Sequence, residues 1–87
     1  MKVVKAYLSL SQLKLGEIAK IISFEDETMA LKLLEMGCIP GETIKLERIA
    51  PMGDPIAIRV SGYLLSLRKA EAAAVMVEKV ISTNSIF

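Results

Sequence analysis

The sequence predicts a small, mainly β domain (a small α+β fold), in which about five short strands form a highly curved barrel and one short helix is inserted after the first strand. The chain has 87 residues, which is enough for about one small domain. Its second half alternates apolar and polar residues in short runs, as half-buried strands do. Gly, Pro, Ser and Asp separate these runs, which is typical of tight turns. We expect one domain over residues 1–87, with a core over 9–80 and a frayed tail over 81–87.

The first third of the chain predicts a helical turn followed by a strand. Residues 9–13 contain a Ser-x-x-Gln capping box, which favours a single helical turn before the break at Gly16. Residues 17–24 are rich in β-branched side chains and predict the first strand. Period-two alternation places three apolar residues of this strand on one face: Ile18, Ile22 and Phe24.

One helix is predicted over residues 28–36, and it ends at Gly37, the residue type that best adopts the left-handed terminal conformation. The acidic residues 25–27 suit the helix N-terminus, and we prefer this interpretation to a metal site because no further ligand type is nearby. The helical period turns Ala30, Leu33 and Leu34 toward the core. It leaves Met29, Leu31 and Met36 on the flanks. A helix that is apolar all round is either well buried or partly offered to a partner.

The second half predicts the remaining strands. Residues 42–50 alternate and then slip in phase at Arg48, which indicates a bulge or strong bend. The elements that follow are a turn over 51–55, a strand over 56–60, a tight turn at Ser61-Gly62, a strand over 63–67 with Tyr63, Leu65 and Leu67 inward, a helical turn over 69–74 and a strand over 75–80. Closing such strands into a barrel would remove exposed edges, and an SH3-like barrel is favoured over an OB-like one.

Composition excludes several kinds of chemistry. The chain has no His and one Cys, so it lacks imidazole metal sites, an internal disulfide and every CxxC motif. The net charge of +1 and the 5% aromatic content argue against a nucleic-acid binder. No catalytic constellation or phosphate loop is present, so we expect a protein that is not an enzyme and has no cofactor and no metal site.

Hydropathy predicts a cytoplasmic protein without direct membrane insertion. The longest unbroken apolar run covers residues 72–77, far short of the roughly 20 residues that span a bilayer. The first eight or so residues are too short and too interrupted by Lys to form a signal peptide.

Three positions have both a structural and a functional interpretation. Asp54 lies in a Gly-Asp-Pro turn, where bonding to nearby backbone amides is favoured over catalysis. Cys38 follows Met36-Gly37 and offers soft sulfur for Cu(I), but a small buried hydrophobe is favoured. Arg68 ends a strand, where a salt bridge within the fold is favoured over docking of an acidic partner.

A set of short motifs resembles one known family. The motifs are, in order, Leu10-x-x-Leu13-x-x-Gly16, Leu33-Leu34-x-Met36-Gly37, Ile39-Pro40-Gly41, Ala50-Pro51-Met52-Gly53-Asp54-Pro55-Ile56, and Gly62 followed by Leu67-Arg68. From Leu10 to Val80 the chain resembles the FeoA family, ferrous iron transport protein A. The resemblance implies an SH3-like barrel and a small cytosolic accessory or regulatory protein. It would work with FeoB, a membrane ferrous-iron transporter that carries a cytosolic GTPase domain.

The residues proposed to meet the transporter, or a second copy of the chain, lie on the helix flank and on the turn that follows the bulged strand. They are Met29, Leu31, Met52, Asp54 and Arg68. Exposed Leu and Met suit an adaptable apolar contact, and loops on a rigid scaffold are common recognition sites. The alternatives are an interaction domain of the iron-dependent-repressor type and a small-barrel adaptor unrelated to iron. An RNA-binding barrel would need a basic stripe and exposed aromatics.

Overall fold

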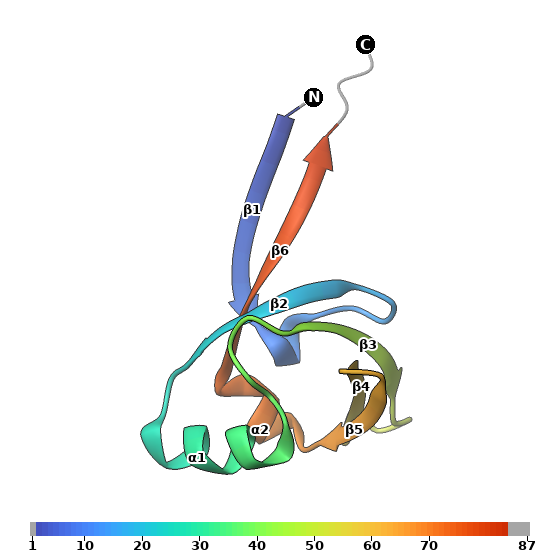
Figure 1. Ribbon diagram of the computed structural model, residues 1–87. Coiled ribbons are helices and arrows are strands. Elements are labelled where there is room, and N and C mark those ends of the chain that lie inside the picture. The colour runs from blue at the N-terminus through green and yellow to red at the C-terminus, as the bar shows by residue number, and fades with distance from the viewer. Residues whose placement is uncertain (1, 84–87) are drawn as a thin grey trace.

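The computed structural model describes residues 2–83 and shows a single antiparallel sheet with two short α-helices (Figure 1). The elements are β1 (Lys2–Ser9), the 3₁₀ turn η1 (Leu10–Gln12), β2 (Ile18–Phe24), α1 (Glu27–Met36), β3 (Thr43–Ile49), β4 (Ile56–Val60), β5 (Tyr63–Leu67), α2 (Lys69–Ala73) and β6 (Val75–Thr83). The six strands lie in the order β1-β6-β2-β3-β4-β5. Within the described part of the chain, neither helix is long and apolar enough to cross a membrane.

Strand β1 is the main addition to the predicted fold. It precedes every predicted element and pairs with β6 from Lys2 opposite Thr83 to Ser9 opposite Met76. Strand β6 consequently runs to Thr83, so the tail expected to fray over 81–87 is paired strand over 81–83. Residues 84–87 lie outside the described range. The helix therefore follows the second strand and not the first.

The sheet is curved but not closed, so the predicted barrel closure is wrong. Among the described residues, β1 and β5 each pair with only one neighbour and form the two edges. Strands β2 to β5 curve around the core, whereas the outer halves of β1 and β6 leave the body as a two-stranded ribbon (Figure 1). We call this ribbon, residues 2–6 with 79–83, the arm.

The core lies between the curved sheet and the helical segments. The largest fully buried side chains are Leu10, Ile21, Leu33, Ile44, Leu46, Ile58, Val60, Leu67, Val75, Val77 and Cys38. In α1 the buried residue is Leu33, whereas Leu34 is 41% exposed. The expectation that Leu34 faces the core is therefore wrong, because only a narrow stripe of α1 contacts the sheet.

Strand β2 buries residues other than the three that were expected to share a face. Ala19 and Ile21 point into the core, while Ile18 and Ile22 are exposed. A register shift between Ile21 and Ser23 then lets Phe24 pack partly against the core. Ile18 and Ile22 therefore share a face as predicted, but Phe24 does not, because this bulge changes the phase of the strand.

The second half follows the predicted order of elements. Strand β3 has its register shift between Leu46 and Arg48, which confirms the expected bulge. The turn between β4 and β5 places Ser61 and Gly62 at positive φ, as a tight hairpin turn requires. Tyr63 is 44% exposed, so it is not the inner-face residue expected. Its hydroxyl instead donates to the Met36 carbonyl oxygen at 3.2 Å.

Candidate partner-binding site

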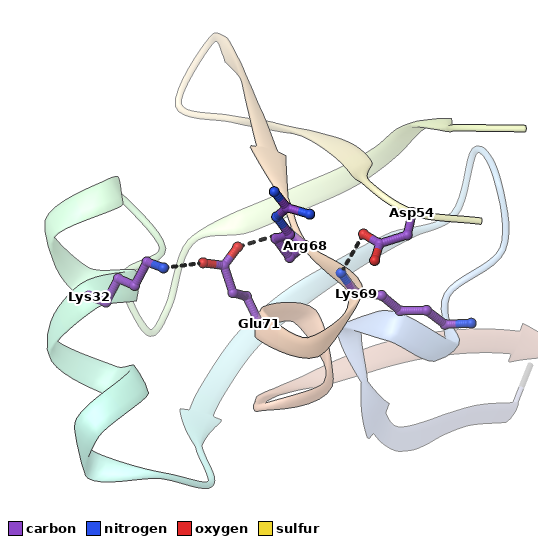
Figure 2. A network of polar contacts seen from close by, with 5 residues as sticks. All are labelled: Lys32, Asp54, Arg68, Lys69 and Glu71. Atoms are coloured by element: carbon purple, nitrogen blue, oxygen red, sulfur yellow. Dashed lines mark hydrogen bonds and ion pairs between the residues drawn. The ribbon is translucent and has the colours of Figure 1, made fainter. Parts of the chain in front are cut away.

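A network of polar contacts joins α1, α2 and the turn over residues 51–55 (Figure 2). The Lys32 Nζ lies 2.6 Å from the Glu71 Oε2, which links α1 to α2. The Glu71 Oε1 accepts the Arg68 backbone N–H at 2.8 Å. The Asp54 Oδ1 accepts the Lys69 backbone N–H at 2.9 Å. These contacts attach α1 and the turn over residues 51–55 to α2.

Glu71 is the buried charge of this network, with 7% of its surface exposed. The hydrogen bond from Lys32 is the main cause that lowers the pKa of its carboxyl, and the Arg68 N–H adds to this effect against the cost of burial. The carboxylate is therefore ionised near neutral pH and paired with Lys32. Sequence reasoning missed Glu71, although a Glu three residues after the N-cap commonly accepts the N-cap backbone N–H, as Glu71 does from Arg68.

Asp54 and Arg68 contribute in ways that differ from their predicted roles. Asp54 does bond a backbone amide, but the amide belongs to Lys69 in α2 and not to its own turn. The Arg68 guanidinium forms no ion pair with residues 2–83, so the favoured internal salt bridge is wrong. Its backbone N–H has the structural role, and its charged side chain is exposed.

The three apolar residues of the predicted surface differ in exposure. Leu31 is 62% exposed and Met52 is 93% exposed, as a contact residue should be. Met29 is only partly buried and packs against the core. In Figure 2, Lys32 of α1 and Asp54 of the turn over residues 51–55 lie at opposite ends of the network, so α1 and this turn are separate segments of the site.

Cys38 and the acidic residues 25–27, the remaining candidates for chemistry, have structural roles. Cys38 is fully buried, and desolvation raises the pKa of its thiol to about 11, so it packs as a small hydrophobe. The Asp26 Oδ1 accepts the Thr28 backbone N–H at 2.9 Å, which confirms the acidic segment as a helix start. Over residues 2–83, no group of three or more His, Cys, Asp or Glu side chains is placed to hold a metal ion.

The fold defines the class of protein: this is an SH3-like domain dominated by one sheet. A crystal structure of FeoA from Stenotrophomonas maltophilia in complex with zinc, described as a prokaryotic SH3 domain protein, superposes with a TM-score of 0.70 and 28% identity. That likeness covers 83% of this chain and 95% of the other.

Sequence comparison then gives the family. Residues 8–79 match the sequence profile of the FeoA domain. The chain belongs to the FeoA family. A solution structure of a FeoA-like protein from Clostridium acetobutylicum is 37% identical and superposes with a TM-score of 0.82 over 92% of this chain and 94% of that one.

A curated relative from Porphyromonas gingivalis, described as a fusion of Fe(2+) transport protein A with the Fe(2+) transporter FeoB, is 39% identical over 79 residues. The match covers 90% of this chain but 9% of that relative. A manganese-dependent transcriptional repressor, 13% identical with a TM-score of 0.77, shares the fold over 87% of this chain and 43% of its own. At that identity the likeness concerns the fold alone.

Proposed function

We propose that this protein is a non-enzymatic, cytoplasmic accessory protein of ferrous iron uptake, and that it acts by binding the FeoB transporter at its cytosolic GTPase domain. The observation that carries the proposal is the Porphyromonas gingivalis relative, in which a homologous segment and FeoB form one chain. The Stenotrophomonas maltophilia relative, described as possibly a ferrous iron transport activating factor, supports the same function. Fusion holds two proteins at high effective concentration, which supports a direct contact between their separate counterparts.

The exposed flank of α1 is the surface that we propose for this contact. Leu31 projects from a helix whose opposite side is anchored by the fully buried Leu33. The Lys32–Glu71 ion pair holds the same helix turn against α2, so Leu31 is presented by a rigid element. A helix that is already held in place loses little conformational entropy on binding, so α1 is suited to present a contact residue. Arg68 and Met52 are exposed residues that we propose as further contacts.

Affinity capture with the cytosolic domain of the FeoB of the same organism tests the proposal, with and without guanine nucleotide. We expect the wild-type protein to bind, and Leu31→Glu to abolish binding while its melting temperature stays nearly unchanged. The matched control is Leu64→Glu on β5, which places the same charge on another partly exposed leucine. Absence of wild-type binding would refute the function, whereas unchanged binding by Leu31→Glu would refute only the surface.

A further inference from the structure

Strands β2 and β6 separate from each other and leave two unpaired strand edges. They pair from Phe24 opposite Val75 to Lys20 opposite Glu78. Beyond this point, within the described residues, β6 continues over Lys79–Thr83 with β1 as its only partner. Strand β2 continues toward Ile18 with β3 as its only partner. The facing edges of the two strands therefore present backbone N–H and C=O groups without a strand partner (Figure 1).

A pocket of about 310 Å³ lies where these strands separate. Its lining residues are Ile18, Ala19, Lys20, Thr43, Glu78 and Val80. We call this place the wedge. Ile18 and Val80 are each 57% exposed and also line a second, adjoining pocket, so both openings share the same apolar walls.

An ion pair links the two sides of the wedge. The Lys79 Nζ of β6 lies 2.6 Å from the Glu17 Oε2, directly before β2. The Glu17 carboxylate also accepts the Lys14 backbone N–H at 2.7 Å, so it is held in place from its own side. The two walls are thus tied together in the free protein. A site that is already formed binds a ligand at a smaller ordering cost.

The arm has an incomplete sheet that a third strand would complete. A two-stranded ribbon alone is only marginally stable in water, and three strands with an apolar face are needed for independent stability. An extended segment along β6 would pair with the open edge over residues 79–83. Its alternate side chains would cover Val80 on one side of the wedge and Ile18 on the other. Main-chain pairing of this kind is a general mode of peptide recognition.

We propose that the wedge binds an extended, mainly apolar segment of the FeoB transporter, which adds a strand to the free edge of β6. The identity of the partner rests on the proposed function. Lys2 and Thr83 are cross-strand partners, so both ends of the described chain lie at the tip of the arm (Figure 1). In a fused relative that shares this fold, a transporter segment joined at either end would begin at the tip of the arm. A short connection would hold such a segment at roughly millimolar effective concentration next to the wedge, which supports the same contact between the separate proteins.

Amide hydrogen exchange and binding by variants test this proposal with the cytosolic domain of FeoB as the partner. On binding, we expect the exchange of the backbone amides over residues 79–83 to slow. Ile18→Glu and Val80→Glu should each weaken binding about tenfold or more, as for a contact residue covered by an interface. The matched control is Val4→Glu, because β6 separates the partly exposed Val4 of β1 from the wedge. Thermal melting checks that each variant remains folded.

The outcomes distinguish a failure of the wedge proposal from a failure of the proposed function. If the wild-type protein does not bind the FeoB domain at all, the proposed function fails and the assignment of the occupant fails with it. If binding occurs but both wedge variants bind normally and exchange over residues 79–83 is unchanged, the wedge proposal is overturned while the function stands. If these amides are already protected in the free protein and it has the mass of a dimer, a second copy occupies the edge and the proposal is again overturned.

Discussion

Gly37 joins α1 to the segment that leads into β3, and two separate constraints require glycine there. Its φ of 104° lies in the left-handed region that side chains with a Cβ avoid. A Cβ at this position would also overlap the Tyr63 hydroxyl. That hydroxyl is held against the helix end because it donates to the Met36 carbonyl oxygen. The sequence showed the first constraint through the helix-ending pattern, but the second depends on a residue from a distant strand.

Gly37→Val should therefore destabilise the protein by about 1–2 kcal/mol or more. Chemical denaturation measures the change in the free energy of unfolding. Repeating the substitution in a Tyr63→Phe background removes the hydroxyl and leaves mainly the backbone strain, so the cost should become smaller. A Gly37→Val protein as stable as the wild type would show that α1 does not end at this residue.

The carboxylate of Glu71 should make stability depend on pH. Because the Lys32 hydrogen bond lowers the pKa of this carboxyl from its ordinary value of 4.5, its contribution is fully present above that value and is lost as the pH falls through the lowered pKa. Glu71→Gln should be destabilised by about 1–3 kcal/mol at pH 7. As the pH falls from about 5 to about 3, the range in which ordinary carboxyls take up a proton, the free energy of unfolding of Glu71→Gln should also decline less than that of the wild type.

Urea denaturation across that range measures both effects. Lys32→Met should flatten the pH profile in the same way, because it removes the partner that favours the ionised carboxyl. Parallel profiles for the wild type and Glu71→Gln would contradict the role assigned to this pair.

The hydrogen bond between the Arg68 backbone N–H and the Glu71 carboxylate could be predicted from the Arg68-x-x-Glu71 spacing. The ion pair could not, since Lys32 and Glu71 meet only through the tertiary packing of two helices.

At the scale of single elements, the residues at which a helix begins and ends were easier to predict than the face that it buries. Helix α1 begins after Asp26 and ends before Gly37 because both signals act within one turn of the chain. The burial of Leu33 and the exposure of Leu34 depend on which part of the sheet lies below the helix, and periodicity cannot supply that information. In β2, one bulge was enough to place Phe24 on a different face from Ile18 and Ile22.

Helix α2 is too short to be stable by itself, so it depends on contacts from other segments. Asp54→Ala removes the acceptor of the Lys69 N–H and should destabilise the protein by about 1 kcal/mol. Amide exchange at Lys69 should accelerate at the same time. Asp54→Asn keeps an acceptor oxygen and serves as the control. Equal stability of the Ala variant and the wild type would show that the turn over residues 51–55 does not support α2.

At the scale of the whole molecule, the order of the predicted elements was correct, but the closed barrel was not, and the arm was not predicted. The first strand and the long last strand support each other, and their pairing joins the two ends of the described residues, Lys2 and Thr83. Nothing local in residues 2–9 specifies that partner, because Lys2 and Lys5 interrupt the apolar alternation. The arm and the wedge could therefore not be predicted, although Ile18 and Val80 were visible as apolar residues.

The protein as a whole should bind Fe(II) no better than in the millimolar range. A hard or borderline cation needs several converging oxygen or nitrogen ligands, and the chain has no His. Residues 25–27 are the clustered carboxylates, and Asp26 is already used to cap α1. Anaerobic titration calorimetry measures the affinity. One stoichiometric site with micromolar affinity would contradict this prediction and would require ligands that converge in a different conformation.

The pairing of Lys2 with Thr83 has a consequence for how the gene could be rearranged. Directly opposed residues on antiparallel strands lie about 5 Å apart, so a loop of a few residues can join them. Such a loop would convert β1 and β6 into an ordinary β-hairpin. New chain ends could then be opened at the exposed Ser61-Gly62 turn without loss of any strand pairing. A circularly permuted chain of this kind should keep the same sheet, because neighbours in the sheet and not their order in the gene hold it together.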